Sequence, residues 1–141
     1  MIKNQQVGFD SIDMIVSIPI HADKRRTRGF DQAEEIGTNL ARLLSKQFSN
    51  ILVKTQNISL HEITSLPDKI EKVKGLYSCD RTLHGERLLI VDDTATTGLD
   101  LGECAKILRQ SGASLVRGFV GGRTVFRVND SPPETGSPVG S

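Results

Sequence analysis

The sequence predicts an α/β domain with a mostly parallel sheet that helices cover on both faces. Runs of β-branched and apolar residues at 13–20, 86–93 and 114–122 are typical of buried strands. In two segments, 31–46 and 101–110, apolar residues instead recur at helical spacing. Strands that alternate with helices in this way form parallel sheets flanked by helices, and ligands bind at the carboxyl ends of their strands.

Composition and cysteine usage restrict the class of protein further. A chain of 141 residues with 37% hydrophobic and 25% charged residues is typical of one soluble globular domain. The net charge of +1 provides no overall attraction to nucleic acid or to an anionic membrane. Cys79 and Cys104 stand far apart, which excludes a zinc ribbon and favours isolated thiols in a reducing cytosol. The chain has no apolar run of membrane-spanning length and no signal-peptide pattern, so we expect a cytoplasmic protein.

The chain divides into an expected domain at 1–128 and a tail at 129–141, which is rich in proline, glycine and serine and is expected to be disordered. Within the domain, residues 51–54 and 75–80 predict short strands. The segment between them, 55–74, has weak periodicity and mixed charge, so it predicts a long loop or hairpin.

Helix boundaries follow from single residues. Asp31 is a suitable N-cap for the helix at 31–46, and Glu34 three residues later completes a capping-box pattern. Phe30 is expected to anchor this helix in the core. Gly112 occupies the position expected just after the end of the helix at 101–110.

The stretch LLIVDDTATTGLD, at 88–100, places two carboxylates, Asp92 and Asp93, at the end of an apolar strand. The polar turn that follows consists of Thr94, Ala95, Thr96, Thr97 and Gly98. Backbone N–H groups of such a turn, together with the positive end of the next helix dipole, form a cradle for a phosphate monoester. Because the carboxylates would repel that phosphate, we expect them to bind the vicinal hydroxyls of a ribose. A simply solvated strand end, or the acidic pair of a receiver domain, explains the Thr-Thr-Gly turn less well.

A run of basic residues follows the first predicted strand. It contains Lys24, Arg25, Arg26 and Arg28, and Gly29 ends it. As a loop at the same sheet edge it could hold a second anionic group such as pyrophosphate, for which arginine provides paired donors. The alternatives are an exposed loop that only adds solubility, or a contact with single-stranded DNA, although no series of aromatic residues accompanies the run.

These motifs together resemble a known family. The stretch LLIVDDTATTG is similar to the phosphoribosyl-pyrophosphate (PRPP) loop of type I phosphoribosyltransferases. The earlier stretch SIPIHADKRRTRGFDQ resembles ComF-type competence proteins, whose Arg-Gly-Phe-Asn-Gln signature stands here as residues 28–32. KVKGLY, at 72–77, is similar to a further strand of that family. The resemblance extends over about residues 15–124.

The resemblance implies a type I phosphoribosyltransferase fold with a flexible hood, here the segment 55–74. The implied ligand is PRPP with Mg²⁺, and the implied reaction displaces pyrophosphate at the anomeric carbon. Asp92 and Asp93 take the catalytic role at the ribose, the turn 94–98 binds the 5-phosphate, and no side-chain metal site is expected. Proteins of this type are associated with DNA uptake, so single-stranded DNA and DNA-uptake proteins are the implied macromolecular partners.

The chain departs from the family in several places. It has no cysteine-rich zinc module, Asp31 replaces an asparagine, and Lys72 stands where asparagine is usual. Asp100 occupies the position of a threonine or serine that would bind the 5-phosphate. Pointing inward, its carboxylate would repel a phosphate by roughly 1–4 kcal/mol; pointing outward, it would cap the helix.

Two function classes therefore remain open. One is a Mg²⁺-dependent phosphoribosyltransferase, favoured by the intact acidic pair and the Thr-Thr-Gly turn. The other is a non-catalytic regulatory module that binds nucleotide or DNA with a degenerate PRPP pocket, favoured by Asp100 and by the altered hood.

Overall fold

The computed structural model describes residues 11–93, 98–121 and 123–127 of the chain. Its main sheet has the strand order β2-β1-β5-β6-β7. Neighbouring strands from β2 to β6 are parallel, and β7 is antiparallel to β6. The strands are β1 (Met14–Ser17), β2 (Gln47–Phe48), β5 (Arg87–Asp92), β6 (Leu115–Val120) and β7 (Arg123–Arg127). The predicted parallel sheet is confirmed, whereas β2 and β7 were not predicted.

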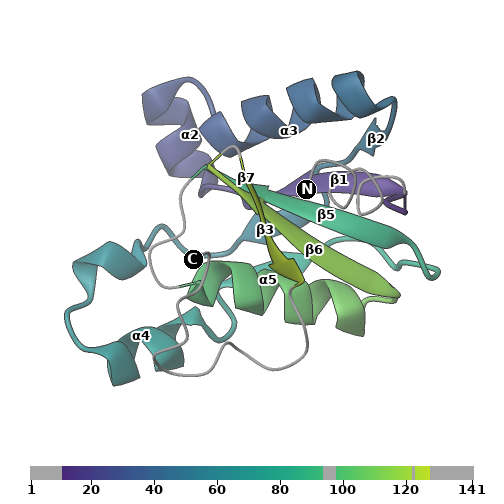
Figure 1. The fold of residues 1–141 in the computed structure, drawn as a ribbon. Coiled ribbons are helices and arrows are strands. Elements are labelled where there is room, and N and C mark those ends of the chain that lie inside the picture. The colour runs from purple at the N-terminus through teal and green to yellow at the C-terminus, as the bar shows by residue number, and fades with distance from the viewer. Residues whose placement is uncertain (1–10, 94–97, 122, 128–141) are drawn as a thin grey trace.

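Helices cover both faces of this sheet, as Figure 1 shows. α3 (Gln32–Leu44) lies on one face and packs Ala41 against a cluster that includes Ile15 and Leu89. α5 (Leu99–Gln110) lies on the other face, where Leu108 packs into the larger core cluster. Since β1 and β5 are covered on both sides, their buried residues are apolar except for Ser17 at the end of β1, as expected for parallel strands.

The start of α3 confirms its predicted cap. The Asp31 side chain accepts a hydrogen bond from the backbone N–H of Glu34 at 3.2 Å, and Asp31 is buried. Phe30, in contrast, is 41% exposed, and the guanidinium of Arg28 lies 4.9 Å from its ring centroid. The prediction that Phe30 anchors the helix in the core was therefore wrong; the cap fixes the helix start.

The basic run is a helix and not the predicted loop. α2 (Ala22–Arg28) begins at His21, whose Nδ1 accepts a hydrogen bond from Asp23 N–H, and ends at Gly29, which has a φ of 82°. None of its residues is buried, so it leaves no hydrophobic periodicity in the sequence. Its ends nevertheless carried local cap signals.

The segment 55–74 is also more regular than the predicted loop or hairpin. It contains a short 3₁₀ helix, η1 (Leu60–Glu62), and an α-helix, α4 (Leu66–Val73). α4 is capped by Ser65, which accepts a hydrogen bond from Asp68 N–H, but buries only Val73. A helix with so small a buried face has weak periodicity, and the Ser-Leu-Pro-Asp cap was the signal that could have revealed it.

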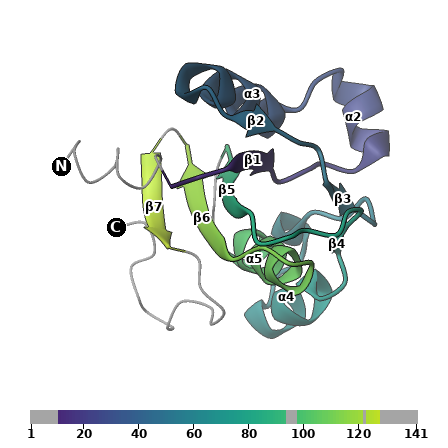
Figure 2. The same cartoon turned by 90° about the vertical axis from the view of Figure 1, so that its right-hand side faces the viewer.

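A second, two-stranded sheet lies beside the main one. It pairs β3 (Leu52–Lys54) with β4 (Tyr77–Cys79) in antiparallel register, so that Lys54 stands opposite Tyr77. These strands flank η1 and α4 in the chain, and Figure 2 shows them on the side of the molecule near α2. This unit, residues 52–79, is called the hood below.

Two glycines of one region provide a matched test of backbone strain. Gly112 has a φ of 125°, and a Cβ placed on it would lie 2.0 Å from the carbonyl oxygen of Leu83. We expect Gly112→Ala to lower the free energy of unfolding by at least about 1–3 kcal/mol. Gly102, within α5, has open space around its Cβ position, so Gly102→Ala should raise it by up to about 1 kcal/mol. Urea denaturation measures both, and equal effects would contradict the strain at Gly112.

Candidate functional site

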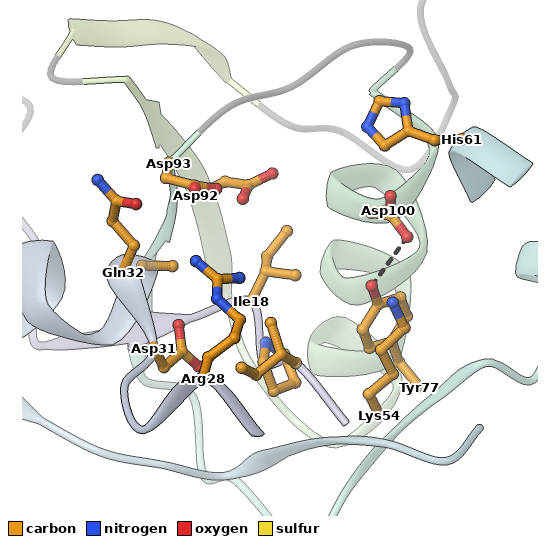
Figure 3. Close-up of a pocket in the computed structure, with 13 residues that line it drawn as sticks. Ile18, Arg28, Asp31, Gln32, Lys54, His61, Tyr77, Asp92, Asp93 and Asp100 are labelled. Atoms are coloured by element: carbon orange, nitrogen blue, oxygen red, sulfur yellow. Dashed lines mark hydrogen bonds between the residues drawn. The ribbon is translucent and has the colours of Figure 1, made fainter. Parts of the chain in front are cut away.

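A cavity of about 130 Å³ opens at the carboxyl ends of β1 and β5. Its walls come from the end of β1, the junction of α2 and α3, the end of β5, the first turn of α5, and the hood (Figure 3). These are distant parts of the chain that the parallel sheet brings to one edge. The cavity therefore lies where ligands bind in open α/β sheets.

The acidic pair forms the β5 wall. Ile18 N–H donates to Val91 O at 2.9 Å and Gly121 N–H donates to Asp92 O at 3.0 Å, so neighbouring strands hold the backbone here. Asp92 and Asp93 both line the cavity. Burial, a hydrogen bond with Asp93 and the negative charges of Asp93 and Asp100 together raise the pKa of Asp92 to about 8. Without a ligand, Asp92 thus retains a proton that an exposed carboxyl would lose.

The start of α5 lies directly beyond the acidic pair. Gly98 is its N-cap residue, with a φ of 78°, and among the described residues no side chain caps this helix. The positive end of the helix dipole favours an anion at this position. Four residues of the predicted phosphate turn lie outside the described residues: Thr94, Ala95, Thr96 and Thr97.

The basic run contributes mainly Arg28 to the cavity. The Arg28 side chain extends into it beneath the acidic pair (Figure 3). Arg25 forms an ion pair with Glu34 of α3. Lys24 and Arg25 are absent from the cavity lining, and Gly29 ends α2 in a left-handed conformation, which glycine adopts without strain. Arg26 is paired with Asp23, so much of the charge of α2 is already neutralised.

Asp100 points into the cavity, and a hood residue holds it there. The Tyr77 hydroxyl donates a hydrogen bond to Asp100 Oδ1 at 2.8 Å. Both residues line the cavity, so the outward-facing helix cap considered for Asp100 is wrong. Burial raises the pKa of Tyr77, and the charge of Asp100 adds to this effect, so the phenol remains a donor.

Sequence reasoning missed three cavity residues that come from the hood: Lys54, His61 and Tyr77. Their segments were identified as short strands or as a loop, but nothing in the sequence placed them over the end of β5. His61 is exposed and also lines the cavity. Only the pairing of β3 with β4 brings these side chains to the site.

Two kinds of feature, a metal-binding cluster and a membrane-spanning helix, are absent from the described part of the chain. It has no group of three or more histidine, cysteine, aspartate or glutamate side chains that could hold a metal ion. None of its helices has the length and apolar character needed to cross a membrane.

The fold and site place the chain in a structural class. It has the type I phosphoribosyltransferase fold: a *B. subtilis* glutamine PRPP amidotransferase, solved in complex with ADP and GMP, matches it with a TM-score of 0.52. That match covers 77% of this chain and 22% of the amidotransferase at 18% identity, so it shows the fold alone.

Curated proteins of similar sequence confirm the recognised resemblance. The DNA utilization protein YhgH of *Escherichia coli* K12 is 29% identical over 111 residues, which cover 78% of this chain and 49% of that protein. Competence protein F of *Haemophilus influenzae* is 26% identical over 109 residues, which cover 74% and 48%. The chain thus spans about half the length of these relatives. No family model matches the sequence.

The raised pKa of Asp92 predicts a dependence of stability on pH. Between about pH 4 and pH 8 the folded chain keeps a proton on Asp92 that the unfolded chain releases, so its contribution to stability falls as pH rises. From pH 5 to pH 7 we expect the wild type to lose about 2–3 kcal/mol relative to Asp92→Asn, which cannot ionise. Urea denaturation of both proteins at each pH checks this; parallel stability curves would show that the carboxyl titrates normally.

The Tyr77–Asp100 hydrogen bond predicts energetic coupling between the hood and α5. Tyr77→Phe removes the donor and keeps the ring, so we expect it to lower the free energy of unfolding by about 1–3 kcal/mol. In the background of Asp100→Ala the same change should cost much less, because its acceptor is already gone. A double-mutant cycle by urea denaturation measures this, and additive effects would argue against the bond in solution.

Proposed function

We propose that this chain binds PRPP or a related ribose 5-phosphate ligand in the cavity and catalyses displacement of pyrophosphate at the anomeric carbon. The observation that carries the proposal is the carboxylate pair at the end of β5, opposite Arg28, at the ligand-binding edge of a phosphoribosyltransferase sheet. Carboxylates and a guanidinium on opposite walls suit a ligand with both hydroxyl and phosphoryl groups.

In this proposal Asp92 and Asp93 accept hydrogen bonds from the vicinal ribose hydroxyls. As the bond between the anomeric carbon and pyrophosphate breaks, its electron pair leaves with pyrophosphate and the sugar becomes transiently cationic. A lone pair of the acceptor, such as a nucleobase nitrogen, then forms the new bond to the anomeric carbon. Anionic carboxylates beside the ring would stabilise that charge. The proton that Asp92 holds in the free protein would be displaced by hydroxyl donors and by this positive charge, since both favour its ionised form.

The phosphoryl groups would be bound at two other walls. Arg28 provides paired donors for the pyrophosphate group. The N-terminus of α5, with Gly98 and the residues before it, is the proposed position of the 5-phosphate. Lys24, Arg25 and Gly29 stay predictions as ligand contacts, and they would require a rearrangement of α2.

Mg²⁺ would bind at this site together with the phosphate groups of the ligand. Protein-bound Mg²⁺ usually keeps water and substrate phosphate oxygens as ligands with one or two carboxylates, so a three-residue protein site is not required. When bound, the ion would neutralise charge on the departing pyrophosphate. The hood carries His61 and Tyr77 at the cavity, and its closure over the ligand would exclude water.

A second candidate is a regulatory module that binds a nucleotide without turnover. The observation that favours it is Asp100, whose carboxylate lines the cavity beside the proposed phosphate position. A role in competence or DNA use is supported by the names of the two relatives, Competence protein F and DNA utilization protein YhgH. Direct contact with single-stranded DNA through α2 has less support, because two of its arginines are paired with acids.

Calorimetry separates these possibilities. With Mg²⁺ present we expect PRPP to bind the wild type, and Asp93→Asn to weaken PRPP at least about tenfold while inorganic phosphate is bound almost unchanged, because only PRPP has ribose hydroxyls. The exposed Asp80→Asn is the matched control and should bind as the wild type does.

Three results would contradict the proposal, in whole or in part. Absence of PRPP binding by folded wild-type protein would reject it entirely. Equal weakening of PRPP and phosphate by Asp93→Asn would reject the ribose role of Asp93. PRPP binding without release of pyrophosphate for any nucleobase acceptor tested would favour the regulatory module.

A further inference from the structure

We infer that Lys54 is an anion-binding residue of the cavity, which holds a phosphate group of the ligand at the wall formed by α5. This inference rests on the proposed function and adds a residue to the site that binds the ligand's phosphate group. It assigns a binding role to Lys54, which the sequence analysis placed only at the end of a predicted short strand.

The first support is the position of Lys54. It is the last residue of β3, it is half-buried, and it lines the cavity together with Tyr77 and Asp100. Its ammonium lies 5.7 Å from the centroid of the Tyr77 ring, a contact that holds the side chain against the hood. Within the described residues, no carboxylate lies close enough to its Nζ to form an ion pair, unlike Lys74 and Lys106.

The second support is the charge around Lys54. Burial lowers the pKa of Lys54, and the charge of Lys24 on α2 lowers it further, whereas the carboxylates of Asp100 and Asp92 raise it. At this partly desolvated position the ammonium of Lys54 is attracted by Asp100 and, less strongly, repelled by Lys24. A phosphate group bound there would relieve that repulsion and replace the lost hydration of the ammonium.

The third support is the carboxylate of Asp100. In the first turn of α5 it would repel a phosphate group at the helix N-terminus. Tyr77 fixes this carboxylate by a hydrogen bond, and Lys54 provides the opposite charge on the adjoining wall. The positive charge of Lys54 therefore offsets the repulsion between Asp100 and a phosphate group bound at the α5 wall.

Lys54 and Arg28 lie on different walls of the cavity, one on the hood beside α5 and the other at the junction of α2 and α3 (Figure 3). The carboxylates of Asp92 and Asp93 form a third wall. Cationic groups at two separate positions and hydroxyl acceptors at a third suit a pentose with anionic groups at both ends.

The test uses ribose 5-phosphate and inorganic pyrophosphate as separate probes, each with Mg²⁺, because the first is proposed to bind at the α5 wall and the second at Arg28. Lys54→Met keeps most of the apolar stem and removes the charge, Lys54→Arg keeps the charge, and the exposed Lys74→Met is the matched control. We expect Lys54→Met to weaken ribose 5-phosphate by roughly tenfold or more and pyrophosphate much less. Lys54→Arg should stay within about threefold of the wild type, and Lys74→Met should not change either affinity.

Unchanged ribose 5-phosphate affinity in folded Lys54→Met would overturn the inference, as would a loss confined to pyrophosphate. If Lys54→Met does not fold, acetylation of the wild-type protein provides the answer by mass spectrometry. Ribose 5-phosphate should slow acetylation of Lys54 and leave Lys74 unaffected, and equal rates with and without the ligand would refute the role of Lys54.

The two proposals can fail separately. If PRPP binds the wild type and Lys54→Met alike, the proposed binding of PRPP stands and the inference falls. If ribose 5-phosphate binding depends on Lys54 but PRPP does not bind, the inference stands and the proposed function falls. If the wild type binds none of the three ligands, both fall.

Discussion

The parallel pairing of β5 between β1 and β6 is the constraint on which the site depends. Its register places Ser17 opposite Val91 and Asp92 opposite Val120, so the three strands end at nearly the same level. Burial on both faces makes this central strand apolar until the sheet edge, where polar side chains become possible. The change from Val91 to Asp92 therefore marks the point at which the core ends and the cavity begins.

Charge in the cavity is arranged against this apolar background. Asp31, Asp92, Asp93 and Asp100 line it together with Arg28 and Lys54. Burial makes an isolated charge costly, so the free protein keeps Asp92 protonated and gives Asp100 a donor from Tyr77. A ligand with both hydroxyl and phosphoryl groups would satisfy the remaining acids and bases, which links the stability of the site to what it binds.

The hood adds side chains to this sheet edge that the strand end and the start of α5 do not provide. Its two strands are short, and their side chains reach the site because β3 and β4 pair with each other beside the main sheet. Backbone and side-chain contacts connect the hood to α5: Tyr77 bonds to Asp100, and Gly75 N–H donates to the nearly buried Glu103 at 3.5 Å. A change in hood position would therefore shift the start of α5, where the phosphate group is proposed to bind.

The sequence by itself determined the parallel sheet, α3 with its Asp31 cap, α5, and the acidic pair at the end of β5, because each has a long apolar pattern or a local cap. Periodicity did not reveal α2 and α4, which bury few or no residues, and only their caps marked them in the sequence. The sequence could not determine β2 and β7, which depend on neighbours for their pairing. The tertiary structure alone decided that Arg28 rather than Arg25 lines the cavity, that Asp100 faces inward, and that Lys54 and Tyr77 join it. Periodicity reports which face of an element is buried, whereas these contacts depend on which distant elements pack together.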